Sequence, residues 1–164
     1  MSRIKLNIDF GGMLEDIKRA GGDVGSAAAK VAKECAKTVH DELVSECSAS
    51  GVPSNISREI TEKVTETAGG NVYTVEVGWE LGNYNPKNIS AGYKAVFLNY
   101  GTARRTVRNK SLQHRNINGS WVTIGENRGS VSGRGFIARA RNSANKKVKR
   151  TQKDALKDIL KGLT

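Results

Sequence analysis

Residues 24 to 47 contain the pattern that most constrains this fold, because an apolar side chain recurs there at every third or fourth position. The positions that share this spacing are Val24, Ala28, Val31, Cys35, Val39, Leu43 and Cys47. In an α-helix these positions fall on one face, while most charged residues of the segment fall elsewhere. The pattern therefore predicts a long amphipathic helix, which must bury one face against the rest of the protein.

Residues 4–10 and 73–79 have a different period, since apolar and polar side chains alternate in both segments. A period of two is typical of strands with one buried face. Residues 57–68 are ambiguous: their apolar residues have helical spacing, but their Thr and Val content favours a strand. Residues 69–71, which are Gly, Gly and Asn, are typical of a hairpin turn. We therefore predict that residues 57–68 pair with the strand that follows them.

Two apolar segments follow in the second half of the chain. Tyr93–Tyr100 is predicted as a short helix or an extended segment, with Val96, Phe97 and Tyr100 facing the core. Residues 137–161 are predicted as a final helix. The apolar positions that align on one face of this helix are Ala140, Ala144, Val148, Ala155, Leu156 and Ile159.

Between these segments, residues 102–135 form a long stretch that is uncommon as a structureless loop in a compact domain. Asn118-Gly119 lies between two short apolar runs, which is a typical signal of a β-hairpin. We therefore predict an extended β-hairpin arm at about residues 102–135. The expected fold is a single α+β domain over residues 1–164, with a long N-terminal helix and a C-terminal helix packed on an antiparallel sheet.

Positive charge is concentrated in the C-terminal part of the chain. From Tyr100 onward there are 16 Lys and Arg against 3 Asp and Glu, whereas the preceding residues have 11 against 13. This asymmetry indicates an acidic partner, either nucleic acid or an acidic protein surface. The candidate contact residues are Arg104, Arg105, Arg108, Lys110 and Arg115 on the arm, and Arg139, Lys146, Lys147 and Arg150 on the final helix.

Other observations weaken the nucleic-acid interpretation. Aromatic residues make up 5% of the chain, and few of them are interleaved with these cations. This is unfavourable for a platform on which single-stranded bases stack. The sequence also lacks a helix-turn-helix or RNA-recognition signature. A charged helix face is, in addition, most often simply solvated.

Motifs for catalysis and for metal binding are missing from the sequence. His40 lies in the sequence HDELV, which lacks the second His of a zinc-binding HExxH motif. His114 lies beside Arg115, a basic neighbour that opposes its protonation. Cys35 and Cys47 would be ~18 Å apart on one helix, too far apart for a disulfide. We therefore predict two buried structural thiols, no enzymatic activity and no cofactor.

The chain contains no apolar run of the length that a membrane-spanning helix requires. The N-terminal residues alternate in polarity and lack the apolar block of a secretory signal. The sequence therefore predicts a protein that is made and used from the cytoplasm, without a membrane partner.

Two segments resemble a known family: Tyr93–Arg105 (YKAVFLNYGTARR) and Gly135–Ala140 (GFIARA). They are similar to the head–tail joining or tail-completion (neck) proteins of tailed bacteriophages, the group that includes minor tail proteins of the Z type. The matching positions are Tyr93, Phe97, Leu98, Tyr100, Gly101 and Thr102, and then Phe136, Ile137, Arg139 and Ala140. Asn99 stands where the family often has Glu. Gly135 and Ala138 stand at the two positions where the second segment of the family has proline.

The resemblance implies that the matching residues are structural, with the aromatic segment packed on the last helix. It implies a structural virion protein of the phage neck or tail end, assembled in the host cytoplasm. Such a protein is expected to form a ring, a hexamer, that joins or completes the tail at the head–tail interface. Its expected partners are copies of itself, adjacent neck, tail-terminator or tail-tube proteins, and packaged DNA without sequence specificity. A basic DNA- or RNA-binding module remains the alternative.

Overall fold

The computed structural model describes residues 2–67, 72–82, 85, 88–102, 113–117, 120–124 and 131–163, and of residues 113–117 and 120–124 it describes the backbone. In chain order the elements are β1 (Arg3–Asp9), α1 (Met13–Arg19), α2 (Val24–Ala49), α3 (Ser54–Ser57), β2 (Thr61–Glu66), β3 (Val72–Gly78), α4 (Ala91–Tyr100), β4 (Gly101–Thr102), β5 (Gln113–Ile117), β6 (Ser120–Ile124), β7 (Val131–Ser132) and α5 (Phe136–Lys161). The mixed α+β class predicted from the sequence is confirmed.

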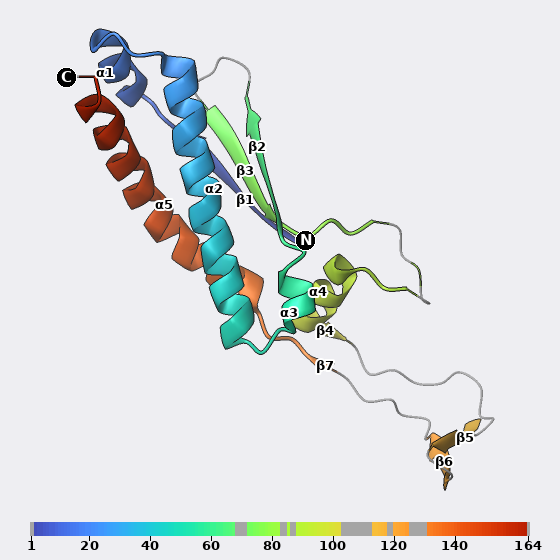
Figure 1. The fold of residues 1–164 in the computed structure, drawn as a ribbon. Helices are drawn as coiled ribbons and strands as arrows, with labels where there is room; N and C mark the ends of the chain where they lie inside the picture. Colours follow the sequence, from blue (N-terminus) through green and yellow to red (C-terminus); the bar gives the residue numbers. More distant parts are fainter. Residues whose placement is uncertain are drawn as a thin grey trace.

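The main sheet has three antiparallel strands in the order β1-β3-β2, so the third strand of the chain lies in the centre and pairs with both others (Figure 1). In the β1–β3 register, Ile4 lies opposite Val77 and Leu6 lies opposite Val75. Because side chains alternate between the two faces of a strand, these buried residues share one face of the sheet. The alternation seen in the sequence therefore marks the face that carries the core.

The segment before β3 differs from our prediction of one strand over residues 57–68. Residues 54–57 form the short helix α3, and β2 begins at Thr61. Ile56 and Ile60 are both buried, and the carbonyl of Ile56 accepts a 2.7 Å hydrogen bond from the indole N–H of Trp79. The helical spacing of Ile56 and Ile60 therefore comes from α3 and the turn after it. The Thr and Val residues that favoured a strand lie in β2. The turn predicted at residues 69–71 lies outside the described residues.

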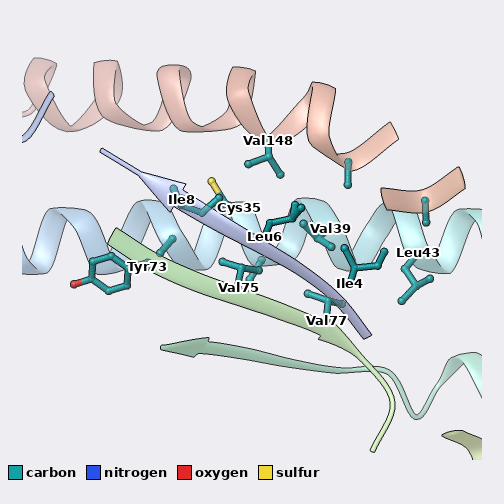
Figure 2. Close-up of a cluster of buried hydrophobic side chains, with 14 of the residues drawn as sticks. Ile4, Leu6, Ile8, Cys35, Val39, Leu43, Tyr73, Val75, Val77 and Val148 are labelled. Carbon is teal, nitrogen blue, oxygen red and sulfur yellow. The ribbon is translucent and has the colours of Figure 1, made fainter. Parts of the chain in front are cut away.

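The two 26-residue helices α2 and α5 run antiparallel to each other along the sheet (Figure 1). Cys35, Val39 and Leu43 of α2 face the buried residues of β1 and β3, and Val148 approaches them from α5 (Figure 2). At its N-terminus, α2 is capped by Asp23, whose carboxylate accepts the N–H of Gly25 at 3.1 Å. Each fully buried Val or Leu stabilises this layer by about 1.5–3 kcal/mol.

The opposite face of the sheet is polar. There the hydroxyl of Thr74 donates to the side-chain oxygen of Asn7 at 3.2 Å. The ammonium of Lys5 lies 3.3 Å from the carboxylate of Glu76. The sheet is therefore covered by helices on its apolar face and carries cross-strand polar pairs on the other.

Both cysteines lie within the core. Cys35 and Cys47 are fully buried and unpaired with each other, and burial raises the pKa of each thiol to about 12. The prediction of buried structural thiols is confirmed. Across the described ranges, no helix combines the length and the apolar character needed to cross a membrane.

Candidate assembly surfaces

The aromatic motif of the sequence forms helix α4, which ends where the predicted arm begins. Its last turn closes on Gly101, whose N–H donates to the carbonyl of Phe97. Gly101 has φ +79° and ψ −175°, a backbone conformation that is essentially restricted to glycine. A Cβ at this position would lie 2.3 Å from the carbonyl oxygen of Val131. The glycine of the motif is thus required both for the turn and for the close approach of the returning chain.

The two ends of the predicted arm are held together at its base. Strand β4 pairs antiparallel with β7, with Thr102 opposite Val131. The N–H of Val131 also donates to the Thr102 hydroxyl at 3.1 Å, and the N–H of Arg134 donates to the carbonyl of Leu98 at 3.0 Å. Further out, β5 and β6 pair antiparallel with each other. Residues 103–112, 118–119 and 125–130 lie outside the described residues, so the arm remains a prediction.

Asn99 connects the two motifs directly. Its side chain is buried, and its Oδ1 accepts a 2.8 Å hydrogen bond from the N–H of Ile137 in the first turn of α5. Its carbonyl accepts the N–H of Gly135 at 3.0 Å. The first N–H groups of a helix lack partners within the helix, and Gly135 at the N-cap has no side chain to supply one. Asn99 therefore caps α5 from a distant position in the sequence.

The sequence does not predict this role for Asn99, which stands where the family often has Glu. The available signal was a polar residue inside an otherwise apolar segment. Such a residue, when buried, needs a hydrogen-bond partner. The sequence alone does not show which partner that is.

The expectation that Phe97 and Tyr100 face the core is wrong, since they are 36% and 59% exposed. Helix α4 instead buries the face that contains Gly92, Ala95 and Asn99. These positions have helical spacing and are small or hydrogen-bonded. The larger aromatic side chains consequently lie on the outer side of the helix. Of the other positions that match the first motif, Tyr93, Leu98, Gly101 and Thr102 are partly buried.

Three of the four positions that match the second motif do belong to the core, and the fourth, Arg139, is exposed. Phe136, Ile137 and Ala140 are buried on α5. The ring of Phe136 packs edge-on against that of Trp79, with 6.2 Å between the centroids. The start of α5 is therefore anchored to the end of β3.

The cations expected on α5 are mostly engaged within the chain. The Nε of Arg139 lies 3.0 Å from a carboxylate oxygen of Glu46, and its Nη2 donates to the hydroxyl of Ser50 at 2.7 Å. Lys147 pairs with Glu42. These contacts fasten α5 to the C-terminal half of α2, so Arg139 and Lys147 have an internal structural role.

Of the other candidates on α5, Arg150 pairs with Asp154 at 3.6 Å, and Lys146 is exposed without an ion pair among the described residues. The remaining candidates are on the arm. Arg104, Arg105, Arg108 and Lys110 lie outside the described residues, and Arg115 is described only in its backbone. That the predicted cations form one surface therefore stays a prediction.

Glu42 contacts two residues of α5. It accepts hydrogen bonds from the ammonium of Lys147 and from the hydroxyl of Ser143. These two bonds lower the pKa of its carboxyl below the usual 4.5. The carboxylate therefore stays charged at neutral pH and links α2 to α5.

A groove of about 1090 Å³ lies between β1 and α5 and was not anticipated from the sequence. All seven residues of β1 line one wall, and Ile137, Arg141, Val148 and Lys149 are among those that line the other. Near one end, the side-chain amide of Gln152 donates to the carbonyl of Asp9 at 2.8 Å. The only indication of the groove in the sequence was the spacing of Arg141 and Lys149, which places both cations close to one face of a helix.

The described part of the chain contains no cluster of three His, Cys, Asp or Glu side chains that could hold a metal. His40 is partly exposed, and its Nδ1 lies 3.5 Å from a carboxylate oxygen of Asp41 and 3.9 Å from one of Glu62.

The described residues form a small α+β fold, with the β4–β7 pair at the base of the predicted arm and a long groove beside the edge strand β1. Residues 11–101, more than half of the chain, match the model of the family described as "Bacteriophage HK97-gp10, putative tail-component". The chain belongs to this family of bacteriophage tail components. The phage-tail resemblance inferred from its motifs is thereby confirmed, and a place in the virion follows. Comparison with curated proteins and with solved structures found no match.

Proposed function

We propose that this protein is a structural subunit of the phage neck or tail end, which forms a ring that joins or completes the tail at the head–tail interface. The observation that carries this proposal is the family match over residues 11–101, which spans α1 to α4 and most of the main sheet. A family of tail components favours a structural role over a catalytic one. The hydrogen-bonded base of the arm agrees with a segment that is positioned for contacts with neighbours.

The proposed partners are further copies of the chain in a hexameric ring, adjacent neck, tail-terminator or tail-tube proteins, and the DNA that passes through the lumen. The excess of positive charge after Tyr100 supports an acidic neighbour or DNA. Because Arg139 and Lys147 are paired with acids of α2, their contribution to DNA contact is reduced. This favours protein contacts as the main interactions.

The test is the size and shape of the purified protein. Multi-angle light scattering and negative-stain imaging are expected to show a closed ring, present alone or on addition of purified tails or neck rings. A protein that stays monomeric and binds neither structure would contradict the proposal. Fluorescence anisotropy with a generic DNA duplex gives the competing result: if binding is tight and weakens steeply with salt while no ring forms, the chain is a nucleic-acid-binding module.

A further inference from the structure

In the described part of the chain, the main sheet has two unpaired edges on opposite sides. Within the described residues, no strand pairs with the outer edge of β1 or of β2, because β3 lies between them. Since β1 and β2 are both antiparallel to β3, they run in the same direction. Exposed edge strands offer unsatisfied backbone groups to another strand.

The edge of β1 borders the groove between β1 and α5. Figure 2 shows β1 passing between α5 and β3, with Val148 of α5 directed toward it. Ile4, Leu6 and Ile8 are buried on the side that faces the helices. An added strand would thus gain backbone hydrogen bonds from β1 and would have α5 beside it.

The α5 wall of the groove is positively charged. Arg141 and Lys149 both line it, both are exposed, and neither has an ion pair among the described residues. On the β1 wall, the charge of Lys5 is offset by Glu76. The groove therefore favours an acidic strand, with the acids on the side that faces α5.

Strand β2 has acids on the corresponding side. Glu62 and Glu66 lie opposite Val77 and Tyr73 of β3, which are buried on the helix-facing side of the sheet. Both glutamates are exposed at the free edge. Among the described strands β5 is a poorer occupant, since Gln113–Ile117 includes His114 and Arg115 and no acid.

We propose that β2 of one copy adds to β1 of the next copy, so that the sheets of neighbouring subunits join. In this arrangement Glu62 and Glu66 of one copy face Arg141 and Lys149 of the next. This inference rests on the ring-forming function proposed above.

The spacing and direction of the charges agree with this pairing. Four residues of strand separate Glu62 from Glu66 by ~13 Å, and eight residues of helix separate Arg141 from Lys149 by ~12 Å. β1 and α5 run in the same direction, because Ser2 and Phe136 both contact Trp79, whereas Asp9 contacts Gln152 at the other end. A β2 strand parallel to β1 would then bring Glu62 to Arg141 and Glu66 to Lys149.

The same geometry explains why the contact would close a ring. Pairing of β1 with β2 uses two different surfaces of the subunit. A head-to-tail contact of this kind generates a closed ring when repeated rotation from one copy to the next brings the last copy back to the first. Pairing of β1 with a second β1 would bring the cationic grooves together. Pairing of β2 with a second β2 would bring the glutamates together.

Disulfide cross-linking of assembled rings tests the pairing. Asn7→Cys on β1 is combined in one chain with Thr61→Cys, Lys63→Cys or Thr65→Cys on β2, which covers three registers on the polar face of the sheet. Within one chain β3 separates the two strands by ~10 Å, beyond disulfide reach. The native Cys35 and Cys47 are buried and do not compete.

After mild oxidation, at least one double variant is expected to give a covalent ladder of oligomers on a denaturing gel, while each single variant stays monomeric on that gel. Asn7→Cys combined with Ser48→Cys, an exposed position on α2, is the matched control and should give no ladder. Intact rings without a ladder in any register, or dimers from Asn7→Cys alone, would overturn the β1–β2 pairing and leave the ring function standing. If imaging shows no ring, both proposals fail.

Discussion

The side-chain oxygen of Asn99 accepts the backbone N–H of Ile137 at 2.8 Å, so the end of α4 caps the start of α5. This hydrogen bond joins the two motifs that the sequence related only through a family resemblance. Because Gly101 and Thr102 pair with the returning strand β7 directly beside it, the contact also fixes the position of the β4–β7 pair at the base of the predicted arm.

Replacing Asn99 by Ala or by Leu is expected to lower the free energy of unfolding by about 1–3 kcal/mol, since a buried N–H of α5 loses its acceptor. The leucine variant has as many side-chain heavy atoms as asparagine and a larger volume, so its loss cannot come from a cavity. Urea denaturation measures the change. Asn55→Ala, at an exposed position in α3, is the control and should change stability by less than about 0.5 kcal/mol. Wild-type stability in both Asn99 variants would contradict the capping role.

Gly101→Ala is expected to destabilise the base of the arm, because the added Cβ would lie 2.3 Å from the carbonyl of Val131. Gly21→Ala is the control, because Gly21 has a similar φ of +76°, but a Cβ there meets nothing within 4 Å. The control should lose about 1 kcal/mol from backbone strain alone. Thermal unfolding should show a clearly larger loss for Gly101→Ala. Equal losses would mean that the close approach at Val131 is unimportant.

The sequence predicted the elements whose burial follows a simple period. The apolar stripe of α2 and the alternation in β1 and β3 are direct consequences of one-sided burial, and all three elements were located correctly. The start of β2 was misplaced, because α3 added helical spacing just before it. Phe97 and Tyr100 were assigned to the core because they are large apolar side chains in an apolar segment, but α4 buries the face that contains Gly92, Ala95 and Asn99.

The groove was missed for a different physical reason. β1 and α5 are separated by more than 120 residues, and no local pattern reports that two such segments lie side by side. The same holds for the internal pairs of Arg139 and Lys147, whose partners are on α2. A charged residue on a helix face looks identical in sequence whether it is solvated, paired or part of an interface.

Glu42→Gln is expected to reduce stability at pH 7 by about 1–2 kcal/mol, because the carboxylate loses charge-assisted bonds from Lys147 and Ser143. The pKa of Glu42 is lower in the folded protein than its usual 4.5. Its stabilisation is therefore complete above the unfolded pKa and is lost as the pH falls through the folded pKa. Urea denaturation from pH 7 down to pH 3 should show the two proteins converging at the acid end. A difference independent of pH would exclude this ion pair as the cause.

Cys35 and Cys47 should resist thiol reagents in the native protein at pH 8, because the thiolate is the reactive form and burial raises both pKa values to about 12. Mass spectrometry after iodoacetamide treatment should find both thiols unmodified in buffer and alkylated in 6 M guanidinium. Rapid labelling of the folded protein would show that α2 opens far more readily than its burial implies.

Reversing the charge of the groove with Arg141→Glu and Lys149→Glu is expected to prevent ring formation, as judged by light scattering. Adding Glu62→Lys and Glu66→Lys to the same chain should restore it, because the facing charges again have opposite signs. Lys153→Glu with Lys157→Glu makes the same change of net charge at exposed positions of α5 that do not line the groove, and should leave assembly intact. Loss of assembly in this control as well would indicate a general effect of net charge.

The most direct test of the central claim is complementation of a phage that lacks this protein. A lysate of such a mutant should contain DNA-filled heads and tails that remain unjoined or incomplete under the electron microscope. Adding the purified wild-type protein is expected to produce joined particles and to raise the plaque titre by several orders of magnitude. Complete, infectious particles in the untreated mutant lysate would contradict the account.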